Sequence, residues 1–133
     1  MATLRFTMKL RLYSLLFFIA FNGFTQQSDS LSNWVTNLTK TNTDSAITFF
    51  MTLVENEPNK AISVGKDVLS QLKTDERDSL VMIMKYEMGQ LHLSLGQLKE
   101  ASKYFDALIN TQGLFQLESQ SYGYKGLGDL AEQ

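Results

Sequence analysis

The sequence contains no cysteine, one histidine and one proline among its 133 residues. The absence of cysteine excludes disulfide frameworks, thiolate nucleophiles, zinc knuckles and a lipid anchor on an N-terminal cysteine. A single histidine argues against a histidine-rich metal site or a pair of histidine acid-base groups. Charged residues make up 20% of the chain and hydrophobic residues 44%. This is the composition of an ordinary globular chain, and its length suits one domain.

Residues 1–25 have the pattern of a secretory signal peptide. Three basic side chains precede an apolar run over residues 12–21, and Gly23 and Thr25 supply small residues at the −3 and −1 positions of a cut after Thr25. The run is short for a bilayer span, which takes roughly 20 apolar residues. An uncleaved segment is the alternative, and it is the only membrane tether that we expect.

Cleavage after Thr25 changes the charge of the chain. It removes three of the 12 Lys and Arg residues and none of the 14 acids, so 9 basic residues remain and the net charge is −5. No basic stripe is left to bind a phosphate backbone, which excludes nucleic acid as the expected partner. Small eukaryotic secreted domains usually carry disulfides. An exported chain without cysteine therefore indicates a protein of the bacterial envelope, in the periplasm or outside the cell.

The chain after the signal segment is predicted to be all-α. Residues 26–42 are rich in Gln, Ser, Asn and Thr and are interpreted as a polar linker that turns helical near Trp34. Over residues 43–133 apolar side chains recur at spacings of three and four, and no stretch alternates with period two. Asp44 is expected to cap the first helix of this domain. Pro58 is expected to begin the second, because proline suits a first helical turn.

Small residues recur at a period near 40. Ala61 and Ala101 are 40 residues apart, each early in the second helix of a pair, and Gly89 and Gly128 are 39 apart, each late in a first helix. A small residue lets two helix backbones approach closely, and Phe105 is expected to fill the groove beside it. The spacing predicts a repeated helical hairpin.

The last helical pattern is predicted to bury Leu117, Tyr124, Leu127 and Ala131. Solenoid repeats bury such faces against a neighbouring repeat, and the chain offers no following helix. We therefore expect the 43–133 domain to be an incomplete part of a longer array. Self-association through the C-terminal helix is the alternative.

Residues 88–105, MGQLHLSLGQLKEASKYF, resemble the tetratricopeptide repeat. The resemblance implies that Gly96 lies at the turn between two helices and that Phe105 is the aromatic residue of the second helix. The chain departs from the family pattern because it lacks the closing proline and because its repeats are further apart than the usual spacing of about 34 residues. Further departures from the family pattern are Lys85, His92 and Leu108. The predicted repeat-packing residues are Ala61, Met88, Gly89, Gly96, Ala101, Phe105, Leu127 and Gly128.

The resemblance implies a short solenoid of antiparallel helix-turn-helix repeats that binds a protein or peptide on its concave surface. Met82, Tyr86 and Tyr122 are the candidate partner contacts, because methionine adapts to varied partners and tyrosine is enriched in interfaces. Met84 and Met88 are predicted to lie in the core. The combination of an export signal with few repeats resembles the N-terminal periplasmic sensory region of bacterial envelope regulators, such as histidine kinases. Signal transduction is therefore the alternative function.

No motif predicts catalysis, a cofactor or a metal. Residues 123–128, GYKGLG, resemble a phosphate-binding loop, but they follow polar helical residues, so helix packing is the better interpretation. His92 is interpreted as a half-buried packing or surface residue. Asp75, Glu76 and Asp78 are interpreted as acids at a helix start, where they favour the helix dipole. We therefore predict that the protein is not an enzyme.

Overall fold

A computed structural model describes residues 29–133. These residues form helices and no strand, which confirms the all-α prediction for this part of the chain. The predicted signal peptide, residues 1–25, lies outside the described residues. The chain divides into two compact units, Met1–Trp34 and Val35–Gln133, and the architecture below is that of the larger unit. Within 29–133 no helix combines the length and the apolar character that crossing a membrane requires.

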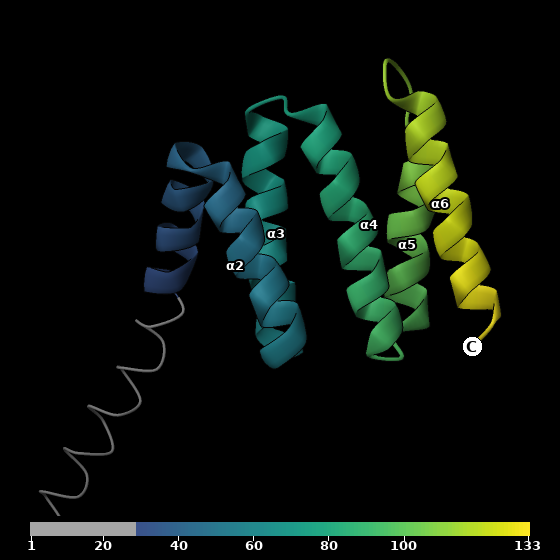
Figure 1. Cartoon of the computed structure of the whole chain (residues 1–133), viewed down its shortest axis with the longest axis horizontal. Helices are drawn as coiled ribbons and strands as arrows, with labels where there is room; N and C mark the ends of the chain where they lie inside the picture. Colours follow the sequence, from purple (N-terminus) through teal and green to yellow (C-terminus); the bar gives the residue numbers. More distant parts are fainter. Residues whose placement is uncertain (1–28) are drawn as a thin grey trace, which may run out of the picture. The chain divides into compact units, whose positions relative to one another are not determined.

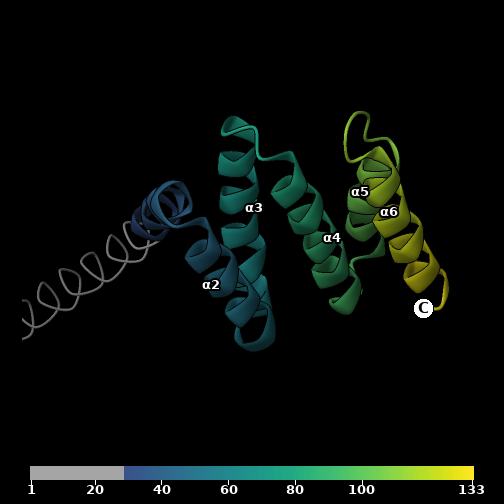
Figure 2. The same ribbon diagram turned by 45° about the horizontal axis from the view of Figure 1, so that its top comes forward.

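Five labelled helices make up most of the larger unit. Their bounds are α2 Thr43–Asn56, α3 Pro58–Thr74, α4 Asp78–Ser94, α5 Leu98–Ile109 and α6 Gln116–Ala131. Each helix packs against the next along the chain, and α6 also contacts α4. Successive helices run in opposite directions and are joined by short turns (Figures 1 and 2). In both views α5 lies against α4 and α6 together, so these three helices share one core.

The polar segment predicted as a linker is helical over residues 29–41, which corrects that interpretation. Its buried face carries Val35 and Thr39, followed by Thr43 at the start of α2. The hydroxyl of Thr39 donates to the carbonyl of Val35 at 2.8 Å, and that of Thr43 donates to the carbonyl of Thr39 at 2.8 Å. Threonine can therefore occupy a buried helical position with its polar group satisfied. An apolar pattern does not detect such a face.

The helix boundaries follow local capping chemistry. The side chain of Asn42 accepts a hydrogen bond from the backbone N–H of Ser45 at 3.1 Å, so Asn42 is the cap of α2 and the prediction of Asp44 is wrong. Asp44 lies in the first turn, where its charge still favours the helix dipole. Pro58 begins α3 as predicted. Gly96 follows α4 in the left-handed conformation, with φ of 69°.

Two glycines set the distances between helices in the core. A Cβ on Gly65 of α3 would collide with the side chains of Met88 and Phe50, and a Cβ on Gly89 of α4 would collide with the ring of Phe105. Both large aromatic side chains are fully buried. Each pairs with a glycine whose missing side chain makes room for the ring. The predicted repeat-packing residues that are completely buried are Ala61, Met88, Ala101 and Phe105.

The face of α6 that the sequence predicted to be buried is mostly exposed, so this prediction is wrong. Leu117 is 82% exposed and Tyr124 is 62% exposed, whereas Ser119, Gly123 and Gly126 are buried. The cause is the close approach of α5: a Cβ on Gly123 would lie only 2.8 Å from the carbonyl oxygen of Phe105. Only small side chains fit where the two helices come this close, so α6 meets α5 there through Ser119, Gly123 and Gly126.

The end of α6 corrects a second prediction. Gly128 is exposed, and a Cβ added to it would meet no atom within 4 Å, so it is not a packing residue in this structure. Leu127 is partly buried and packs with Leu130 against the core cluster that contains Phe105. Ala131 is exposed.

Candidate functional site

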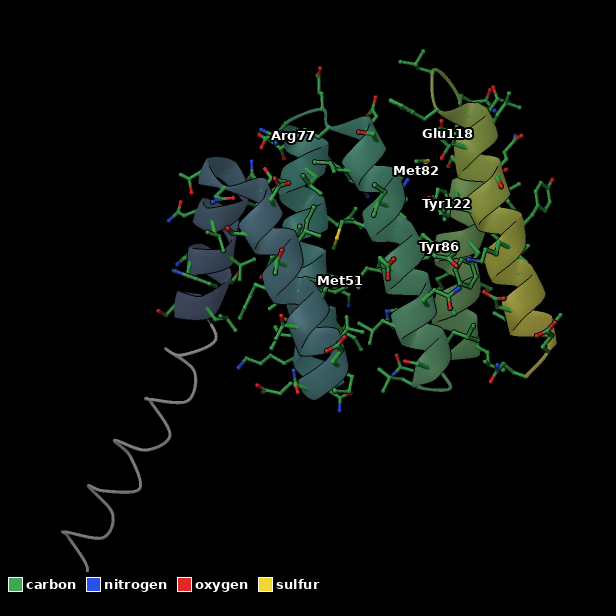
Figure 3. All side chains as sticks on the ribbon, viewed as in Figure 1. Met51, Arg77, Met82, Tyr86, Glu118 and Tyr122 are labelled. Atoms are coloured by element: carbon green, nitrogen blue, oxygen red, sulfur yellow. The ribbon has the colours of Figure 1, made fainter. Side chains whose placement is uncertain are left out.

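The candidate site is an aromatic and polar cluster between α4 and α6. Tyr86 of α4 and Tyr122 of α6 lie beside each other, with ring centroids 5.0 Å apart and planes at 50° (Figure 3). Tyr86 is half-buried, and its ring centroid is 6.3 Å from that of Phe105 in the core. Tyr122 is 37% exposed. The pair therefore extends from the core to solvent, and α5 holds it in place because α4 and α6 both pack on that helix.

A hydrogen-bond network joins the two helices next to these rings. The Gln90 side-chain amide of α4 donates to Asp129 Oδ2 of α6 at 2.8 Å and to the Tyr86 hydroxyl at 3.1 Å. Lys125 Nζ lies 5.3 Å from the centroid of the Tyr86 ring, within range of a cation–π interaction. The cluster is thus ordered by contacts from both helices, which lowers the entropy that a bound partner would have to remove.

Two titratable groups of the cluster have shifted pKa values. The hydrogen bond and the charge interaction with Tyr86 raise the pKa of Lys125 above its ordinary value, with a smaller contribution from Asp129. Burial raises the pKa of Glu87, and the positive charge of Lys125 partly opposes this rise. Lys125 therefore supplies a cation to this face at neutral pH, and Glu87 supplies a carboxylate that is costly to desolvate.

Apolar side chains lie beside the polar network. Ile83, Glu87 and Gln90 follow one another on α4 at spacings of four and three, so they share one face of the helix. Ile83 is 38% exposed, whereas Met82 and Met84 on either side of it in the sequence are buried. Met51 of α2 is also exposed (Figure 3). Apolar, aromatic and charged groups are thus available on the surface of the first helix of each hairpin and on α6.

The structure separates the three predicted partner contacts. Tyr86 and Tyr122 come together in the cluster described above. Met82 is only 7% exposed and belongs to the core cluster with Leu93, Phe105 and others, so its prediction as a partner contact is wrong. It shares this cluster with Ala101, Phe105 and Leu108 of α5, and it is not one of the α4 residues that the apolar spacing predicted to be buried. Met84 and Met88 are fully buried, which confirms their assignment to the core.

The sequence reasoning missed Gln90, Lys125, Glu87 and Asp129. A usable signal was present, because Gln90 and Asp129 are 39 residues apart, the same offset that separates Gly89 from Gly128. Tyr86 and Lys125, which also interact, have the same offset. The offset between small residues on the two helices therefore also predicts which polar residues meet.

A small hollow of about 140 Å³ lies between the N-terminal half of α4 and the segment before α6. Its lining residues are Asp78, Val81, Met82, Lys85, Thr111, Gln112, Leu114 and Phe115. Burial and the nearby charge of Lys73 lower the pKa of Lys85, and Asp78 partly opposes this effect. The hollow has room for a few water molecules or a small fragment.

The remaining candidates have structural roles. His92 is buried and stacks on Tyr104 with ring centroids 5.5 Å apart, and its Nδ1 lies 2.6 Å from Gln97 Oε1, so it is a packing residue. Asp75 is the C-cap of α3 and accepts a hydrogen bond from Gln71 at 2.9 Å. Glu76 lies in the following turn, so only Asp78 is at a helix start and the interpretation of the other two acids is wrong. Between residues 29 and 133 no group of three or more His, Asp or Glu side chains could hold a metal ion.

No family model, curated protein or solved structure matches this chain.

Proposed function

We propose that the helices over residues 43–131 form a scaffold of the tetratricopeptide type that binds a protein or an extended peptide without catalysing a reaction. The proposed binding face is the α4–α6 face, defined as Ile83, Tyr86, Glu87, Tyr122 and Lys125. The observation that carries the proposal is the ordered pair of tyrosines, which presents two amphipathic rings to solvent next to a cation and a carboxylate. Tyrosine is enriched in protein interfaces and among the residues that dominate binding energy.

The arrangement of helix pairs supports the repeat interpretation. The close contact of Gly89 with Phe105 joins the two helices of the α4–α5 pair at the positions where the family places a small residue and an aromatic residue. The contact of α4 with α6 brings a first helix next to the following one. In tetratricopeptide arrays the first helices line the concave, ligand-binding surface. The tyrosine pair lies on those two helices.

A peptide selection with matched variants tests this function. The full chain is immobilised and a random peptide library displayed on phage is selected against it, and the affinity of the recovered peptides is measured by interferometry. We expect Tyr122→Ala to weaken their binding at least about tenfold, which corresponds to about 1.4 kcal/mol. The control is Tyr124→Ala, two residues away on α6 but outside the α4–α6 face. Recovery of no peptide above background, or equal binding by the Tyr122 variant, contradicts the proposal.

We also propose that the chain is exported to the periplasm or the extracellular space, where its partner would be found. The support is the basic, apolar and small-residue pattern of residues 1–25. Expression in a secreting bacterium, followed by mass spectrometry of the purified chain, tests it. The expected N-terminal residue is Gln26, and recovery of an intact Met1 in the cytoplasmic fraction would contradict export.

A further inference from the structure

The side of α6 that faces away from α5 is a continuous surface with unusual composition. Leu117, Ser121, Tyr124, Gly128 and Ala131 follow one another at spacings of four, three, four and three, so they form one stripe along the helix, here called the outer face. All five are exposed. The outer face lies opposite the small residues that pack on α5. It therefore exposes Leu117 and Tyr124 on a side of α6 where none of the other described helices packs.

The apolar surface extends beyond the helix. Leu114, in the segment before α6, is 92% exposed. Leu114 and Leu117 lie at the N-terminal end of this surface and Tyr124 lies near its middle, while the small residues Gly128 and Ala131 lie toward its C-terminal end. Exposed large apolar groups gathered on one helix mark an interaction surface more often than scattered ones do.

We propose that the outer face of α6 binds the same face of a second copy of this chain, in an antiparallel helix pair with two-fold symmetry. With the two-fold axis between residues 122 and 123, Leu117 of one copy lies opposite Gly128 of the other, and Tyr124 lies opposite Ser121. Each large side chain then meets a small one, and both contacts occur twice because the interface is the same patch on both subunits.

The size pattern selects this direction of pairing. A parallel pair would place Leu117 against Leu117 and Tyr124 against Tyr124, and it would leave Gly128 facing Gly128 across an unfilled space. An unfilled space loses the dispersion contacts of the atoms around it. Only the antiparallel pair fills the small positions with the large side chains.

The charges beside the outer face agree with the same geometry. Glu118 and Lys125 are seven residues apart and lie on one flank of the helix. In an antiparallel pair the same flanks of the two copies meet, and a rise of about 1.5 Å per residue places Glu118 about 3 Å along the axis from Lys125 of the other copy. Because Lys125 Nζ lies over the Tyr86 ring at 5.3 Å, the two opposite charges attract each other through space and not as a direct ion pair. The attraction between Glu118 of one copy and Lys125 of the other favours this register over shifted registers.

Single-cysteine variants test the pairing, because the natural chain contains no cysteine to interfere. Ser121→Cys is placed next to the proposed axis, and Ser63→Cys on the exposed surface of α3 is the matched control. Both full-length variants are treated with a short bismaleimide, and the covalent dimer is quantified by gel and mass spectrometry. We expect at least about tenfold more dimer for the variant at 121, since the pair holds its two thiols together.

A second measurement reads the assembly without a cross-linker. Analytical ultracentrifugation of the full chain over a concentration series is expected to show a monomer–dimer equilibrium. Leu117→Glu places a charge on the outer face and should raise the dissociation constant at least about tenfold. The control is Leu98→Glu, which changes an exposed leucine on α5 and should leave the dissociation constant unchanged. Circular dichroism verifies that each variant is folded.

Three results would overturn the dimer. The chain could be monomeric at every concentration, which would mean that another occupant uses the outer face. Cross-linking could be equal at positions 121 and 63, which would mean that association occurs elsewhere, for instance through the apolar N-terminal run. Leu117→Glu could leave the dimer intact. Leu117→Glu distinguishes failure of the dimer from failure of peptide binding, because Leu117 belongs to the outer face and not to the α4–α6 face.

Discussion

At the scale of single residues, two turns share one hydrogen-bond pattern but differ in the residue at the strained position. After α3 the N–H of Arg77 donates to the carbonyl of Leu72 at 3.0 Å, and after α4 the N–H of Gln97 donates to the carbonyl of His92 at 2.9 Å. This is the Schellman pattern, which requires a left-handed residue. At the first turn that residue is a glutamate with φ of 54°. At the second it is a glycine.

The residue types at these turns predict stability changes of opposite sign. Glu76→Gly should raise the free energy of unfolding by about 1 kcal/mol, because glycine adopts the left-handed region without the steric cost of a Cβ. Gly96→Ala should lower it by a similar amount for the same reason. Urea denaturation followed by circular dichroism measures both. A Glu76→Gly variant less stable than the parent would show that the glutamate side chain has a role that outweighs the strain.

The half-buried Glu87 predicts a pH dependence. Because burial raises the pKa of Glu87 in the folded chain, the native state binds the proton more tightly than the unfolded state does. The group therefore favours folding at low pH, and this contribution is lost as the pH rises through the raised pKa. Glu87→Gln removes a carboxylate that is costly to desolvate at neutral pH.

The expected result is a Glu87→Gln variant that is more stable than the parent at pH 7 and loses that advantage under acidic conditions, where the parent side chain is protonated in both states. Thermal denaturation across a pH series measures this difference. An advantage that is constant with pH would show that desolvation of the carboxylate is not its source.

At the scale of the helix, the two faces of α6 respond differently to the same substitution. A Cβ on Gly126 would collide with the ring of Phe105, whereas a Cβ on Gly128 would meet no atom within 4 Å. Gly126→Ala should therefore destabilise the chain by about 1–3 kcal/mol through overpacking. Gly128→Ala should stabilise it by up to about 1 kcal/mol, because alanine is the better helix former.

These two variants differ in position by only two residues, so each is the control for the other. Denaturation should be measured at concentrations low enough for the chain to be monomeric, since Gly128 also lies on the proposed dimer face. Equal losses of stability would mean that Gly128 packs against a part of the protein that the described helices do not include.

At the scale of the larger unit, helix contacts are between neighbours along the chain, with α6 also reaching α4. Stability in such an arrangement is shared between adjacent helices and need not be uniform. Phe105→Ala should cost about 3–5 kcal/mol, because the ring fills the space between α4, α5 and α6. Hydrogen exchange should show the largest loss of protection in those helices and a smaller loss in α2 and α3.

Phe50→Ala is the matched variant for the first half of the unit, because this ring is also fully buried and packs against Gly65 of α3. It should reduce protection mainly in α2, α3 and the adjoining face of α4. If both variants reduce protection uniformly from residue 43 to residue 131, the unit unfolds as one cooperative block and the neighbour-by-neighbour picture is wrong.

The sequence by itself was sufficient to determine local features of this protein. The spacing of apolar residues predicted the helices from residue 43 onward, because each of these helices buries one stripe of its surface. Pro58 and Gly96 marked a helix start and a helix end, since their backbone preferences act within a few residues. The close contact of Gly89 with Phe105 was predicted by the small and aromatic residues of one hairpin.

The tertiary structure alone decided which surfaces meet and which remain exposed. The buried face of α6 is made of Ser119, Gly123 and Gly126 because the backbone of α5 comes too close for larger side chains, and that distance is set by two helices together. The arrangement of neighbouring helices also decides that Met82 lies in the core and that Gln90 of α4 donates a hydrogen bond to Asp129 of α6. A pattern of apolar residues records how much surface a helix buries, but the separation of two backbones decides whether leucine or glycine does the burying.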